Sequence, residues 1–117
     1  MHDYKKLGVW QESITLVTEI YELTDNFPDK EKFNLINQLN RAAVSLPSNI
    51  AEGAGRLTEK DFVKFLGYAN GSGYEVETQL IIAYNLQYIT NEQKDEILNK
   101  LTIIQRKIYR LIKSLQK

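Results

Sequence analysis

The amino-acid sequence predicts an all-α fold: an antiparallel up-down-up-down four-helix bundle formed by a single domain over residues 1–117. Apolar residues recur at spacings of three and four along four segments, and only short connections with proline, glycine or capping residues separate these segments. A chain of 117 residues is long enough to enclose one hydrophobic core, and no Ser/Gly/Pro-rich stretch is present that could link two domains.

The first helix is predicted over residues 8–25. Its apolar face is formed by residues three or four apart, Leu7, Trp10, Ile14, Val17 and Tyr21, and is widened by Leu16, Ile20 and Leu23. Pro28 disfavours helical geometry at Phe27 and has no backbone N–H to donate. We therefore expect the helix to end near Asp25.

The second helix is predicted over residues 29–54, directly after Pro28. Its apolar residues keep the same spacing: Ile36, Leu39, Ala43, Leu46 and Ile50. Pro47 lies inside this run, where a proline removes one backbone hydrogen bond at a cost of about 3 kcal/mol. Because the apolar spacing continues through Pro47, we predict one kinked helix rather than two shorter helices.

The third helix is predicted over residues 59–88, after a candidate capping box formed by Thr58 and Asp61. Its apolar face is made of Phe62, Leu66, Ala69, Gly73, Val76, Leu80 and Ala83. A glycine inside a helix costs about 1 kcal/mol relative to alanine. Gly67, Gly71 and Gly73 therefore predict a close approach of another backbone, and the alternative interpretation is a frayed or bent helix.

The fourth helix is predicted over residues 91–116. Thr90 and Gln93 form a second candidate capping box at its start. An uninterrupted heptad stripe follows, made of Ile97, Leu101, Ile104, Ile108, Leu111 and Leu115.

The residues that enzymes use are scarce in this sequence. His2 is the only histidine and cysteine is absent, which leaves no histidine-based triad and makes a metal cluster unexpected. The segment 71–73 follows no strand, so it is not a phosphate-binding loop, and Glu75 and Glu77 point to different faces of a helix. We predict a protein that is not an enzyme and binds no cofactor or metal.

Charge and composition also bear on location. Fifteen basic and fifteen acidic residues give zero net charge, and no apolar run approaches membrane-spanning length. The polar segment 1–10 lacks the apolar core of a secretory signal, and a chain without cysteine fits a reducing compartment. We expect a soluble, cytoplasmic protein without a membrane partner.

A polar stripe runs beside the apolar face of the second helix, and a shorter one follows the third. The first consists of Arg41, Ser45, Asn49, Glu52 and Arg56, and the second of Ser72, Glu75 and Gln79. One interpretation is a buried or interfacial network in which an arginine pairs with Glu52 or Glu75, and the other is an ordinary solvated face. The network hypothesis predicts at least one hydrogen-bonded charge pair that is shielded from water.

Segment 40–56 carries a resemblance to a known family. It reads NRAAVSLPSNIAEGAGR, which strongly resembles the signature of the bacterial 23S ribosomal RNA intervening-sequence proteins. Further matches cover most of the remaining chain: 62–66, Ala69, 71–72, Glu75 and 77–80. The resemblance implies a four-helix protomer, a homo-oligomer in the form of a pentameric ring, and an unassigned biochemical role.

A related group, the accessory variability determinants of diversity-generating retroelements, forms a basic pentameric barrel that binds RNA and a reverse transcriptase. This chain departs from that group in its zero net charge. It also carries Gly73-Tyr74 where a larger apolar residue is usual after Gly-Ser, and Asn70 where a basic residue is common.

Basic residues are concentrated in the fourth helix. From Asn99 onward there is no acidic residue, whereas six basic ones are present: Lys100, Arg106, Lys107, Arg110, Lys113 and Lys117. Such a helix could bind phosphate groups of RNA. The favoured interpretation is that these side chains pair with acidic residues of a neighbouring helix such as Glu12, Glu19 and Glu22, because only Tyr109 accompanies them for base stacking. Two hypotheses follow: an oligomeric scaffold for an unidentified protein partner, and an RNA-binding accessory protein.

Overall fold

The computed structural model describes residues 1–117 and contains four α-helices and no strand. The helices are α1 (Gly8–Thr24), α2 (Leu35–Ala54), α3 (Glu59–Asn85) and α4 (Asn91–Leu115), with short 3-10 turns η1 (Tyr4–Lys6) and η2 (Asp29–Glu31). The molecule measures 45 × 24 × 20 Å. None of its helices has the length and apolar character needed to cross a membrane.

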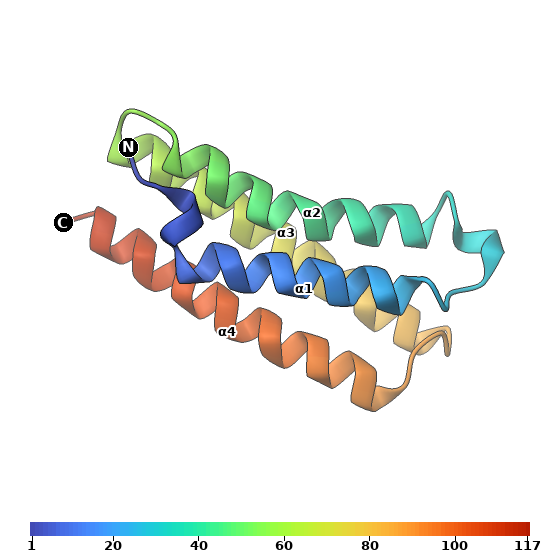
Figure 1. The fold of residues 1–117 in the computed structure, drawn as a ribbon. Coiled ribbons are helices and arrows are strands. Elements are labelled where there is room, and N and C mark those ends of the chain that lie inside the picture. The colour runs from blue at the N-terminus through green and yellow to red at the C-terminus, as the bar shows by residue number, and fades with distance from the viewer.

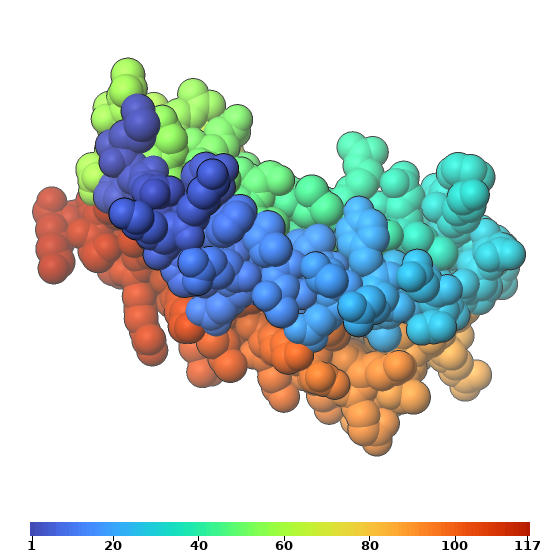
Figure 2. All heavy atoms as spheres, viewed as in Figure 1, coloured from blue at the N-terminus to red at the C-terminus, as the bar shows by residue number.

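The helices form the predicted up-down-up-down bundle. The two termini and the α2–α3 connection lie at one end, and the α1–α2 and α3–α4 connections lie at the other (Figure 1). Helix α2 packs against α1 and α3, and α4 packs against the same two helices, so α2 and α4 are diagonal. Figure 2 shows α1 between α2 and α4 on one face, with the N-terminal segment covering one end of α1.

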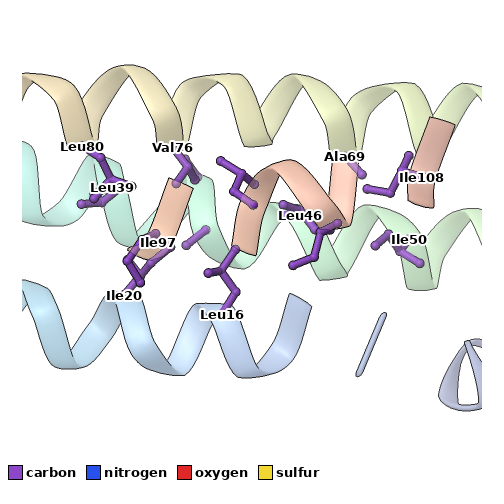
Figure 3. Close-up of a cluster of buried hydrophobic side chains, with 14 of the residues drawn as sticks. Leu16, Ile20, Leu39, Leu46, Ile50, Ala69, Val76, Leu80, Ile97 and Ile108 are labelled. Atoms are coloured by element: carbon purple, nitrogen blue, oxygen red, sulfur yellow. The ribbon is translucent and has the colours of Figure 1, made fainter. Parts of the chain in front are cut away.

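All four helices contribute to one core of 22 buried apolar residues. Figure 3 shows side chains from every helix meeting along the bundle axis, among them Leu16, Leu39, Val76 and Ile97. The heptad residues that were predicted to be buried in α3 and at the start and middle of α4 are buried in the structure. These apolar stripes therefore face the core as predicted.

The buried face of α1 differs from the predicted one. Ile14 and Tyr21 are exposed, while Leu16 and Ile20 form the centre of the buried face. The polar residues Ser13 and Thr24 are also buried on this face, and they interrupt its apolar periodicity in the sequence. Ser13 Oγ donates to Trp10 O at 2.7 Å, which satisfies the buried hydroxyl within the helix.

The limits of two helices also differ from the prediction. α2 begins at Leu35 instead of residue 29, because the chain first makes the turn η2 and Asn34 has a non-helical backbone with φ −118° and ψ −103°. α3 ends at Asn85 instead of residue 88, because Gln87 adopts a left-handed backbone with φ 65°. α2 continues through Pro47 as a single helix, as the apolar spacing predicted.

The glycines of α3 divide into two kinds. A Cβ added to Gly73 would lie 2.4 Å from Gln105 Nε2 and 3.3 Å from Leu101 Cδ1, so this glycine permits close packing of α4. Gly67 and Gly71 have no neighbouring atom within 4 Å of the position that a Cβ would take. The predicted close approach of another backbone is therefore wrong for all three glycines within one chain: Gly73 makes room for side chains of α4, and Gly67 and Gly71 face open space.

Candidate interaction surfaces

The two polar stripes meet across a groove between α2 and α3. Ser72 Oγ of α3 donates to Ser45 Oγ of α2 at 2.9 Å, and Asn49 Nδ2 donates to the same oxygen at 3.0 Å. These neutral groups are half-buried or buried, and they connect the helices directly. Helical spacing alone could not reveal this pairing, since it depends on the register between α2 and α3.

The groove continues past these hydrogen bonds toward the start of α2. It has a volume of about 350 Å³, and we name it the α2–α3 groove after its lining residues Asn37, Gln38, Arg41, Ala42, Ser45, Glu75 and Gln79. Gln79 Oε1 is buried in the wall without a hydrogen-bond partner. A buried acceptor without a partner is costly, by roughly 1–3 kcal/mol. The single chain thus leaves one amide oxygen of this groove unsatisfied.

The charged members of the stripes form no shielded pair in the chain. The closest pair is Arg56 Nη2 with Glu52 Oε1 at 3.9 Å, and these side chains are 45% and 55% exposed. Glu52 lies in α2 and Arg56 in the α2–α3 connection, and water screens the attraction between these exposed side chains. Arg41 and Glu75 line the same groove but form no ion pair with each other. The predicted water-shielded charge pair is therefore absent from the isolated chain.

The outer face of α3 borders the α2–α3 groove and exposes both glycine and apolar residues. We name Gly67, Tyr68, Gly71 and Ile82 the α3 ridge. Tyr68 and Ile82 are exposed, and the two glycines have free space above them. Each glycine costs the helix about 1 kcal/mol relative to alanine. No contact within the chain offsets this cost.

Two of the six basic residues from Asn99 onward pair with α1. Lys100 Nζ lies 2.5 Å from Glu19 Oε2, and Lys107 Nζ lies 2.5 Å from Glu12 Oε1. The hydrogen bond to Glu19 raises the pKa of Lys100 above its ordinary value of 10.5. For these two lysines the predicted pairing with Glu12 and Glu19 is confirmed. Glu22 forms no ion pair.

The other four basic side chains, Arg106, Arg110, Lys113 and Lys117, have no carboxylate partner. Two of them line a second groove of about 340 Å³, which we name the α3–α4 groove after its lining residues Asn70, Tyr74, Thr102, Gln105, Arg106, Tyr109 and Arg110. Lys113 Nζ lies 5.3 Å from the centre of the Tyr109 ring. None of the lining residues is acidic.

The sequence predicts no site role for four residues of the α3–α4 groove: Asn70, Tyr74, Thr102 and Gln105. Asn70 and Tyr74 are four apart and therefore share a face of α3. Gln105 Nε2 donates to Asn70 O at 3.2 Å, in the space that Gly73 leaves open. The sequence pattern that indicates this groove is the helical glycine Gly73 with polar and aromatic residues on either side of it.

The bundle is electrically polarised although its net charge is zero. If each helix is divided near its middle, the half that holds both termini comprises segments 1–15, 46–71 and 104–117 and carries ten basic and five acidic residues. The opposite half carries five basic and ten acidic residues. The α3–α4 groove extends into the positive half through Arg106 and Arg110.

The structure contains no group of three or more His, Cys, Asp or Glu residues placed to hold a metal ion. The single histidine, His2, pairs through Nε2 with Glu59 Oε1 at 2.9 Å on the surface. His2 N also donates to Ala54 O at 2.7 Å. These contacts fasten the N-terminal segment to the α2–α3 connection.

Comparison with known proteins places the chain in a family. Residues 5–110 match the sequence profile of the 23S rRNA-intervening sequence protein family. The fold is similar to the crystal structure of a protein with unknown function from the S23 ribosomal protein family of Bacteroides thetaiotaomicron VPI-5482, with a TM-score of 0.80 and 28% sequence identity. That match covers 90% of this chain and 98% of the other. No curated protein matches the chain. With the profile extending over nearly its whole length, the chain belongs to the 23S rRNA-intervening sequence protein family.

Proposed function

We propose that this protein is a non-enzymatic interaction module that assembles with copies of itself and acts as a scaffold. The observation that carries the proposal is the α3 ridge, where two helical glycines stand open beside exposed Tyr68 and Ile82. An open glycine on a helix permits close approach of another chain, and the exposed apolar side chains supply area to bury. Assembly would thus offset a helix-propensity cost that the single chain leaves uncompensated.

The α2–α3 groove supports the same proposal. Gln79 Oε1 lacks a partner, and Arg41 and Glu75 are available for pairing with another subunit. Polar groups of this kind contribute specificity at an interface because a wrong partner leaves them unpaired. The α3 ridge and the α2–α3 groove together form the proposed self-association surface, which we name the α2–α3 surface.

The proposed assembly is a pentameric ring, as the family resemblance implies. Closed rings with an odd number of subunits require heterologous contacts, in which one surface meets a different surface of the next subunit. The α2–α3 surface supplies one side of such a contact.

A charge substitution on the α3 ridge tests the proposal. Ile82 is 42% exposed and Ile14 of α1 is 41% exposed, so Ile14→Glu is a matched control for Ile82→Glu. We expect sedimentation velocity to show that Ile82→Glu reduces the assembly to monomers, whereas Ile14→Glu leaves it intact. An assembly that survives Ile82→Glu, or one that Ile14→Glu alone dissociates, would reject the α2–α3 surface. Circular dichroism of both variants verifies that the bundle remains folded.

A second candidate function is RNA binding through α4. It is favoured by the four basic side chains without a carboxylate partner and by the positive half of the bundle. Electrostatic binding to phosphates weakens steeply with salt, so this function predicts RNA affinity at low salt that falls on the addition of salt. Absence of binding at low salt would leave self-assembly as the only proposed function.

A further inference from the structure

The α3–α4 groove presents cations at a regular separation. Arg106 and Arg110 are one helical turn apart on α4, which sets their Cα atoms about 6 Å apart along the axis. Neither guanidinium is within ion-pairing distance of a carboxylate. By contrast, a third groove, between α1 and α4, has Glu12 and Glu19 among its lining residues. The arginines of the α3–α4 groove are therefore free to bind neighbouring phosphates bidentately.

Two exposed tyrosines stand in the same groove. Tyr74 comes from α3 and Tyr109 from α4, and they are 59% and 56% exposed. Exposed aromatic rings next to arginines are the elements from which single-strand binding surfaces are built, because every base has a face that can stack. Tyr74 is on a different helix from the arginines, which is why the aromatic component is visible only in the folded chain.

The groove also contains an unused hydrogen-bond acceptor. Asn70 Oδ1 is buried and has no partner, while Gln105 donates to the backbone oxygen of the same residue. A donor on a ligand, such as the amino group of a base or a ribose hydroxyl, would satisfy this oxygen if the Asn70 side chain turned toward the groove. The unsatisfied atom is thus a second indication of a ligand, independent of charge.

We infer that the α3–α4 groove binds nucleotides of single-stranded RNA, with Arg106 and Arg110 on phosphates and Tyr74 and Tyr109 stacked on bases. The inference rests on the RNA-binding alternative and adds the site, the strandedness of the ligand and the role of each residue. A duplex keeps its bases stacked within the helix and offers no free face to the tyrosines, so the groove selects single strands.

Fluorescence anisotropy with a labelled 12-nucleotide oligouridine tests the site on the full chain at low and at physiological salt. Arg106→Gln with Arg110→Gln removes two charges from the groove, and Lys5→Gln with Lys6→Gln removes two exposed charges from the same half of the molecule without touching the groove. We expect the arginine variant to bind at least about 10-fold more weakly and to lower the slope of log affinity against log salt by about 1.4, since each single-strand phosphate contributes about 0.7. The lysine variant keeps the slope of the wild type.

Tyr74→Leu tests stacking without a change of charge. We expect a loss of about 5-fold or more in affinity with an unchanged salt slope, because base–aromatic stacking is worth about 1–3 kcal/mol per base. A Tyr21→Leu variant, which alters an exposed tyrosine of α1 outside both the groove and the α2–α3 surface, should bind as the wild type does. Equal losses of RNA affinity in the two variants would show that Tyr74 is not part of the site.

Each negative result of the binding experiments rejects a different part of the inference. If the wild type does not bind the oligonucleotide at low salt, both the groove and the RNA-binding alternative are rejected. If the lysine and arginine variants weaken binding equally, binding is a property of the positive half and the groove is rejected alone. If uridine monophosphate displaces the oligonucleotide at the same nucleotide concentration, the ligand is a free nucleotide and the single-strand assignment is overturned. A duplex that binds as tightly as the single strand overturns the stacking role.

Discussion

Replacing Gly53 by alanine tests how closely α2 packs on α3. A Cβ added at Gly53 would lie 2.7 Å from Phe65 Cβ and 3.3 Å from the backbone oxygen of Phe62. Neither atom is the end of a flexible side chain, so the helices themselves have to move. Carbon atoms in contact are normally about 3.5–4.0 Å apart, which requires a displacement of about 1 Å.

The expected loss of stability follows from two opposing terms. Overpacking a well-packed core costs about 1–3 kcal/mol, and the displacement of a whole helix puts Gly53→Ala in the upper part of that range. Better helix propensity of alanine returns about 1 kcal/mol. We expect a net loss of about 1–2 kcal/mol, or a fall in Tm of roughly 4–8 °C for a chain of this size.

Thermal and urea unfolding followed by circular dichroism measure this effect at one fixed protein concentration. Gly55→Ala is the matched control, because its Cβ would lie 3.7 Å from the nearest atoms and the residue has an ordinary φ of −83°. The control is expected to change the free energy of unfolding by less than about 0.5 kcal/mol. A Gly53→Ala variant as stable as the control would refute the close packing of α2 on α3.

Two further predictions concern polar contacts. Hydrogen bonds to Glu19 and Glu31 raise the pKa values of Lys100 and Tyr88 above 10.5 and 10.0, so the folded chain holds these protons more tightly than the unfolded chain. The stability that they contribute is complete below about pH 10 and is lost as the pH rises through the raised pKa values; urea midpoints that stay constant up to about pH 12 would contradict this linkage. Ser45→Ala removes the acceptor that two side chains share and should lower the free energy of unfolding by about 1–2 kcal/mol, which urea titration at neutral pH will measure against the neighbouring exposed substitution Ser48→Ala.

The fold was predictable because apolar periodicity and capping are local properties. The capping box at Thr90 shows this well, since Thr90 Oγ1 accepts from Gln93 N and Gln93 Oε1 accepts from Thr90 N, as the two side chains predicted. The start of α2 was not predictable from periodicity, because residues 29–34 carry little apolar pattern and local backbone geometry decides their conformation. Apolar periodicity does not predict the burial of Ser13 because serine is polar. Its hydroxyl can be buried because it donates a hydrogen bond to Trp10 O within α1.

The candidate surfaces were predictable only in part. Spacing along one helix identified the polar stripe that contains Ser45 and Asn49, and the basic residues of α4. Which of these side chains meet a partner depends on the register between helices. The register between α1 and α4 brings Lys100 and Lys107 to carboxylates of α1. The register between α3 and α4 places Tyr74 in the same groove as Arg106. No pattern within a single helix contains that information.

The mass of the protein in solution tests the central proposal, self-assembly, most directly. Native mass spectrometry over about 1–100 µM protein distinguishes a single chain of 13.6 kDa from its multiples. The α3 ridge and the α2–α3 groove predict an assembly, and the family resemblance implies a mass of five chains. A mass of one chain at every concentration would contradict self-assembly through the α2–α3 surface.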